Sequence, residues 1–134
     1  MKIQEQDGFL EVERAELGPP DTPSEDDVLL NVSVGVSGYS AADQSWVVGS
    51  DLKHFLTELR ALEQKRQGSA LLVSPSPDDL RLQFYSTDSA GHMAVRGHLG
   101  WNKANGFLLQ LQFGFSFEPD KLPYILDYFE AVGQ

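Results

Sequence analysis

The stretch SDLKHFLTELRALEQKRQ, residues 50–67, is the only long segment of this sequence with a clean helical period. Its apolar residues follow the i, i+3, i+4, i+7 spacing of one helical face. They are Leu52, Phe55, Leu56, Leu59 and Leu62. Ser50 is placed to cap the first N–H groups, and Gly68 is placed to end the helix. We therefore expect a helix roughly 27 Å long that lies across a sheet.

The segments on either side of this helix alternate with the period of β-strands. The clearest is residues 28–36, in which valine and leucine alternate with small or polar residues. Residues 9–17 predict a first strand, whose charge is typical of a sheet edge. The apolar residues 107–117 predict a last strand that is central in the sheet or lies in a sandwich core, and residues 119–132 predict a second amphipathic helix.

Together these patterns predict an α+β fold in a single domain covering residues 1–134. We expect six or seven mostly antiparallel strands, either as one curved sheet or as a sandwich. One amphipathic helix is inserted midway and one lies at the C-terminus. The chain has no cysteine, which excludes disulfides, thiolate metal sites and cysteine nucleophiles.

The charge of the chain is concentrated near its start. The net charge is −10, and residues 1–27 contain nine acidic residues against two basic ones. This acidic segment repels phosphate backbones, so we expect no nucleic-acid partner. It would attract a basic protein partner, although it can equally serve only to keep the chain in solution. No apolar run has the length of a membrane helix or the form of a secretion signal, so a cytoplasmic protein is expected, with no membrane partner.

The residues that most often carry catalysis do not form a recognisable site. His92 and His98 fall on one face of a predicted strand but roughly 20 Å apart, too far to share a metal ion. The acidic runs at residues 25–27 and 78–79 lie in proline-rich turns rather than on converging elements. No phosphate-binding loop or nucleophile elbow is present. We therefore expect no enzyme activity, no cofactor and no metal.

The remaining candidates are residues suited to binding another protein. Arginine and tyrosine are typical of interface hot spots, and carboxylates would meet a basic partner. The candidate partner-binding residues are Glu11, Glu13, Glu25, Asp26, Asp27, Tyr85, Arg96 and His98. Because the loop that holds residues 25–27 supplies no core, we expect that neutralising its acids leaves the fold intact.

Three segments in this order resemble one family of small bacterial proteins. They are VLLNVSVGVSGYSAADQSWV at 28–47, SDLKHFLTELRALEQ at 50–64 and FLLQLQFGFSFEPDKLPYILDYFEAV at 107–132. This pattern is similar to that of the WapI-family immunity proteins and their uncharacterised relatives. The resemblance implies an α+β protein that binds and neutralises, in the cytoplasm, the toxic C-terminal domain of a contact-delivered bacterial toxin.

The leading hypothesis is thus a non-enzymatic protein-binding module of the immunity type. The alternative is a small-molecule-binding or weakly enzymatic domain with a pocket between sheet and helix, whose mouth would hold Tyr85, Arg96, Trp101 or His98. A homodimer joined through the polar face of the sheet is a third hypothesis.

Overall fold

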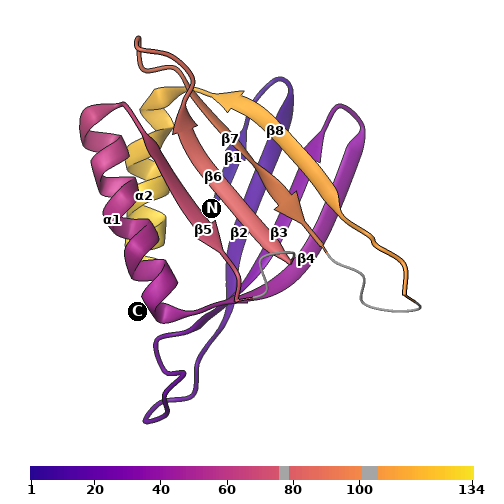
Figure 1. Cartoon of the computed structure of the whole chain (residues 1–134), viewed down its shortest axis with the longest axis vertical. Helices are drawn as coiled ribbons and strands as arrows, with labels where there is room; N and C mark the ends of the chain where they lie inside the picture. The colour runs from indigo at the N-terminus through magenta and orange to yellow at the C-terminus, as the bar shows by residue number, and fades with distance from the viewer. Residues whose placement is uncertain (76–78, 101–105) are drawn as a thin grey trace.

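The computed structural model describes residues 1–75, 79–100 and 106–134, and these form two antiparallel sheets and two helices (Figure 1). The first sheet holds β1 (Lys2–Gln4), β2 (Gly8–Leu17), β3 (Val28–Val36) and β4 (Tyr39–Val47). The second holds β5 (Ser69–Val73), β6 (Leu80–Ser86), β7 (Met93–Leu99) and β8 (Leu111–Phe117). In each sheet the strands lie side by side in chain order.

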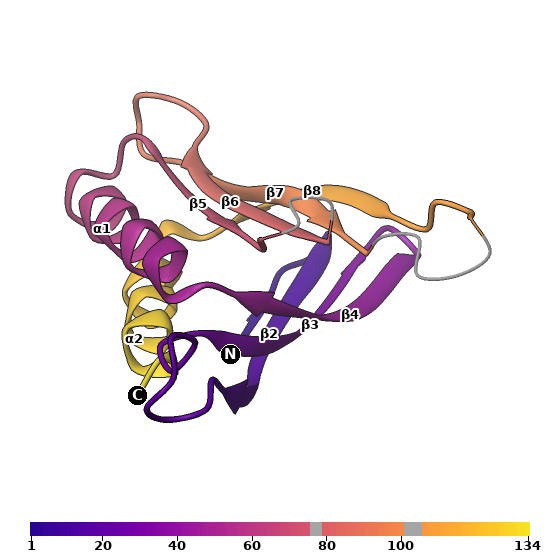
Figure 2. The ribbon, with the colours of Figure 1, turned by 60° about the horizontal axis from the view of Figure 1, so that its bottom comes forward.

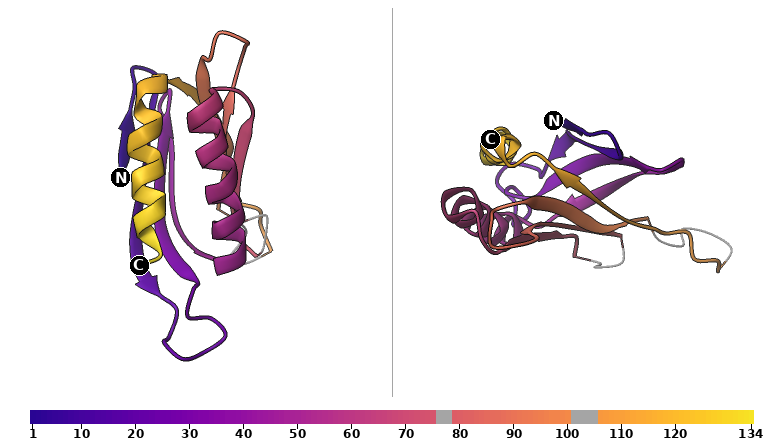
Figure 3. Two further views of the ribbon diagram at one scale, coloured as in Figure 1. Left: turned by 90° about the vertical axis from the view of Figure 1, so that its left-hand side faces the viewer. Right: turned by 90° about the horizontal axis from the view of Figure 1, so that it is seen from above.

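Helix α1 (Gly49–Lys65) connects the two sheets, and α2 (Leu122–Val132) follows β8 through the short 3₁₀ helix η1 (Pro119–Lys121). The sheets lie one over the other, and the two helices run side by side along one flank of the pair (Figures 2 and 3). The prediction of an α+β fold is confirmed. The described strands number eight, however, and they form two sheets, because alternation shows which residues are buried but not which strands pair.

One prediction about edge strands is wrong, and another is confirmed in only one of its alternatives. Strand β2 is not an edge, because the three-residue β1 pairs with it, and so short a strand has no period to detect. Strand β8 is not central in its sheet but is the last strand, although its Phe115 and Phe117 do lie in the core, as the other alternative expected. Its apolar alternation requires only one covered face, which an edge strand can also have. Residues 107–109, expected to belong to this strand, lie outside it and are exposed.

The core lies between the sheets and under the helices. Four phenylalanine rings join the helices to the second sheet: Phe55 of α1 lies 5.0 Å from Phe129 of α2 and 6.1 Å from Phe84 of β6. Phe84 in turn lies 6.1 Å from Phe117 of β8. The main contacts of α1 with other elements are with β5, α2 and β6, so the helix lies along the β5 edge of the second sheet and not, as the sequence predicted, across that sheet. Helix α1 therefore closes the side of the two-sheet core.

Candidate functional site

The structure separates the candidate partner-binding residues into three surfaces. Glu11 and Glu13 of β2 alternate with buried residues and lie on the outer face of the first sheet. Residues 25–27 belong to the loop between β2 and β3. Tyr85, Arg96 and His98 lie on β6 and β7, on the outer face of the second sheet. The sequence therefore identified residues that do not form one continuous site.

The loop of residues 18–27 folds back on itself and against the start of α1. The Gly18 N–H donates to the carbonyl of Asp27 at 2.8 Å, and the Asp21 N–H donates to Oε2 of Glu25 at 3.0 Å. Oδ1 of Asp27 accepts a hydrogen bond from the Gly49 N–H at 2.9 Å, at the first residue of α1. A Cβ built on Gly49 would lie 2.6 Å from Cβ of Asp26, so the two segments touch closely.

Asp27 therefore caps α1 from a distant loop, which corrects one expectation and revises another. The residue before the helix is Val48 with no side-chain cap, so Ser50 does not cap it. We now expect Asp27 to contribute to stability, because a carboxylate at a helix N-terminus satisfies a free N–H group and interacts favourably with the helix dipole. Sequence spacing could not show this, since the cap lies 22 residues from the N–H group that it binds.

The outer face of the second sheet is basic. The strand register places Arg81 beside His98 and then Gln112, and places Gln83 beside Arg96 and then Gly114. Strands β5 to β8 contain no aspartate or glutamate, whereas the whole chain carries a net charge of −10. The outer face of the first sheet carries Glu11, Glu13 and Glu16 instead. The two outer faces are thus of opposite charge.

Arg96 is held in one orientation on this basic face. Its Nε donates to Oε1 of Gln83 at 2.8 Å, and its guanidinium lies over the ring of Tyr85, 4.3 Å from the centroid. Stacking and a fixed hydrogen bond reduce the entropy that an arginine loses when it binds a carboxylate. The Nη groups make no hydrogen bond within the described parts of the chain, and they remain available to a ligand.

A shallow hollow of about 400 Å³ lies on this face, between Arg81, Arg96, His98 and Gln112. It reaches Phe113 at the edge of the sheet. There it adjoins a mostly apolar groove of about 370 Å³, lined chiefly by Val36, Tyr39, Leu111 and Phe113, and the two hollows share Gln112 and Phe113. The basic face therefore continues around the edge of β8 into an apolar groove between β8 and the β3–β4 hairpin.

Large apolar side chains are exposed at Tyr39, which lines this groove, and in the segment that precedes β8. The exposed fractions are 72% for Tyr39, 72% for Phe107, 59% for Leu108 and 73% for Leu109. Residues 106–110, which precede β8, extend beyond the sheets in Figures 1 and 2. Sequence reasoning placed Phe107 and Leu109 in the core, although three consecutive apolar residues at 107–109 already break the alternation of a half-buried strand. Exposed apolar patches of this kind mark interaction surfaces.

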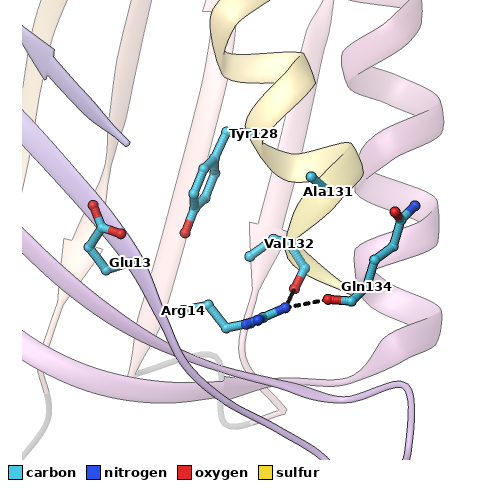
Figure 4. Close-up of a pocket in the computed structure, with 6 residues that line it drawn as sticks. All are labelled: Glu13, Arg14, Tyr128, Ala131, Val132 and Gln134. Carbon is cyan, nitrogen blue, oxygen red and sulfur yellow. Dashed lines mark hydrogen bonds between the residues drawn. The ribbon is translucent and has the colours of Figure 1, made fainter.

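A separate hollow of about 400 Å³ lies between β2 and the end of α2 (Figure 4). Nη1 of Arg14 donates to the carbonyl of Val132 at 3.2 Å and also to that of Gln134, which fixes the end of the helix. Burial, and after it the charge of Glu13, raises the pKa of Tyr128 above its ordinary value. The phenol is therefore neutral at physiological pH and not activated as a base.

The pocket expected between sheet and helix does not contain the residues proposed for it. Tyr85, Arg96 and His98 lie on the outer face of the second sheet, away from the hollow beside α2. Trp101 lies outside the described residues. The side chain of His98 is half-buried and has a partner of its own.

His92 does not share a strand face with His98, because it precedes β7 in the turn after β6. Its Nδ1 lies 2.6 Å from Oδ2 of Asp88. This hydrogen bond is the main cause that lowers the pKa of Asp88. In the described ranges, no three histidine, aspartate or glutamate side chains converge as a metal site would require.

The described residues define a class of fold: two four-stranded antiparallel sheets flanked by two helices, with a basic outer face that adjoins an apolar groove. The sequence matches the Immunity protein WapI-like family over residues 2–133, and the chain belongs to that family. The resemblance seen in the sequence is thus confirmed. Searches of curated proteins and of solved structures found no match. Neither described helix has the length and apolar character needed to cross a membrane.

Proposed function

We propose that residues 1–134 act as one domain that binds and inhibits a bacterial toxin domain in the cytoplasm, without catalysis. The observation that carries this proposal is the match to the immunity family over residues 2–133. The surface supports it, because arginine, tyrosine and exposed apolar side chains lie together around β8, and these residue types dominate protein interfaces.

The acidic start of the chain has a separate role in this proposal. Nine acidic residues in positions 1–27 create a negative field that attracts a toxin domain of positive charge. Such a field acts before contact and raises the association rate more than the final affinity. Salt screens this field over about 8 Å at physiological ionic strength, so the association rate should fall as salt is added.

We expect the neighbouring reading frame to encode a large secreted protein with a basic C-terminal toxin domain. Co-expression with that toxin domain tests the proposal. Cells that make the toxin domain alone should stop growing, and cells that also make this chain should grow. The same chain should give no protection against an unrelated toxin domain of similar charge. Death of cells that contain the folded chain and its neighbouring toxin would contradict the proposal.

A titration separates binding from catalysis. A binding inhibitor must occupy one toxin domain per copy, so residual toxin activity should fall linearly with added chain and reach its minimum at equimolar amounts. An enzyme that modifies the toxin would protect at far lower ratios, with a rate that depends on time. Complete inhibition at one copy per ten toxin domains would favour the enzymatic alternative.

A further inference from the structure

Trp46 points outward from the first sheet. On β4 it alternates with Ser45 and Val47, which are buried, whereas the side chain of Trp46 is 39% exposed. The register places it beside Leu29 of β3, and places Leu29 in turn beside Glu16 of β2. Tryptophan is enriched at interface hot spots, so an exposed tryptophan on a sheet face is a candidate anchor.

Acidic residues share this face with the ring. Glu16 lies in the same row of the register as Trp46, Glu13 lies in the next row and Glu11 in the row after that. Two strand spacings separate Trp46 from Glu16, which is roughly 10 Å between their Cα atoms. A long side chain that lies over β3 can therefore contact the ring and the carboxylate together.

The basic residues of the first sheet lie away from the ring. Strands β1 to β4 contain two of them, Lys2 and Arg14. Nζ of Lys2 lies over the ring of Phe9, 5.0 Å from its centroid, and Arg14 binds the end of α2. Neither of them therefore neutralises the carboxylate in the row of Trp46.

The acidic loop of residues 18–27 extends from the same end of the first sheet (Figure 1). Leu17 and Val28 are the last pair of β2 and β3, and they lie next to the row that holds Trp46. The acids of the loop and the exposed ring thus lie at one end of the sheet. A basic partner that the loop attracts would arrive beside the ring.

We propose that the toxin domain docks on the outer face of the first sheet and lays a basic side chain over Trp46. The ring attracts the cation electrostatically, and the carboxylate of Glu16 accepts a hydrogen bond from it. A cation–π contact is stronger when it is removed from water, as it is at the centre of an interface. This inference rests on the proposed function, because the toxin domain is its partner.

Charge identifies the group that this face holds. A carboxylate or a phosphate would be repelled by Glu16 and Glu13, whereas an arginine or a lysine would be attracted. The outer face of the second sheet has the opposite preference, because Arg81 and Arg96 lie there. A basic side chain of the toxin domain is therefore held at Trp46 rather than on the second sheet.

A second copy of this chain is a poor source of the basic group. The Arg96 guanidinium is stacked on Tyr85 and Arg96 Nε donates to Gln83, so it would have to leave both to reach Trp46 of another copy. Contact between two different faces also leaves one face of each kind open in every pair. Such contacts build open chains of molecules, whereas a toxin domain occupies the face in a one-to-one complex.

Binding of the purified neighbouring toxin domain to four variants tests the inference. Trp46→Ala removes the ring, and Glu16→Lys reverses the charge in its row. Tyr124→Ala is the control for the ring, because Tyr124 is 50% exposed but lies on α2. Asp127→Lys is the control for charge, because it changes the net charge equally at an exposed position of the same helix.

The expected result is a loss of affinity of about thirtyfold or more for Trp46→Ala, with little change for Tyr124→Ala. Glu16→Lys should bind about tenfold more weakly than Asp127→Lys, since both variants lose the same net attraction. Oxidative footprinting should show that the Trp46 ring is protected in the complex. Thermal melts show which variants fold, and Glu16→Lys still tests the site if Trp46→Ala unfolds.

Three outcomes would overturn the inference. If the unmodified chain binds and Glu16→Lys binds as well as Asp127→Lys, or Trp46 stays open to oxidation, the proposed function stands and the Trp46 site is wrong. If the unmodified chain does not bind the toxin domain at all, the proposed function and the Trp46 site fail together. If the unmodified chain alone sediments as an oligomer that Glu16→Lys disperses, a second copy occupies this face.

Discussion

Single residues connect parts of this chain that lie far apart in sequence. The carboxylate of Asp27 binds the Gly49 N–H and so attaches the β2–β3 loop to the start of α1. Lys121 of η1 forms an ion pair with Glu5 beside β1 and donates to the carbonyl of Gln4 at 2.8 Å. Arg14 of β2 binds the last carbonyls of the chain. These side chains hold the helices to the first sheet.

Replacing Asp27 with alanine should lower the free energy of unfolding by about 1 kcal/mol, the usual cost of removing a side-chain cap. The loss arises because the Gly49 N–H remains without its acceptor. Asp26→Ala is the matched control, because its carboxylate lies 3.8 Å from exposed Lys53, and an exposed pair of this kind contributes about 0–1 kcal/mol. Urea denaturation followed by circular dichroism measures both. Equal midpoints for the two variants would mean that Asp27 does not stabilise α1.

The secondary-structure elements all contribute to the core, but they differ in how much of each is covered by neighbouring elements. Helix α1 covers β5 and contacts α2, and its buried face is formed by Leu52, Phe55, Leu59 and Leu62. Leu56 has the same helical spacing but is only half-buried. Strand β8 places Phe115 and Phe117 in the core while its outer edge is unpaired within the described residues.

Replacing Phe55 with alanine should destabilise the fold by about 3–5 kcal/mol, because the ring is fully buried between Phe84 and Phe129. The smaller side chain would leave a cavity where the helices meet the second sheet. Leu56→Ala, on the same helix, should cost only about 1–2 kcal/mol, because part of its side chain already contacts water. Thermal melts compare the two. A larger effect for Leu56 would show that the buried face of α1 is wrongly assigned.

At the scale of the whole molecule, charge is distributed unequally. The acidic loop and the outer face of the first sheet are negative, whereas β5 to β8 carry Arg81 and Arg96 and no acid. This separation of charge gives the molecule an electric dipole. A partner of positive charge would be attracted to the acidic side.

The on-rate with the toxin domain should fall by about tenfold or more between 50 and 500 mM salt if the acidic segment steers association. Glu25→Gln together with Asp26→Asn should slow association further while the off-rate changes little. Asp27 is left unchanged because it caps α1. Neutralising exposed Asp120 and Asp127 removes the same charge elsewhere and serves as the control. Stopped-flow kinetics would reject steering if the on-rate ignored both salt and the substitutions.

Local patterns predicted much of the fold. The apolar spacing of residues 52–62 predicted α1 to within two residues at each end, and alternation predicted β3. Of the candidate site, Tyr85 and Arg96 do lie together, because both residues point outward from neighbouring strands. The exposed residues 107–109 were wrongly placed, because hydrophobicity alone does not show whether a side chain finds a partner to cover it.

The sequence by itself determined the class of the fold, the two helices and the family, since these depend on periodicity and order along the chain. Only the tertiary structure decided the division into two sheets, the cap that Asp27 provides, and the position of β8 at an edge. The physical reason is the same in each case. Periodicity reports how each residue relates to its neighbours in the chain, whereas strand pairing and distant hydrogen bonds depend on which segments meet in space.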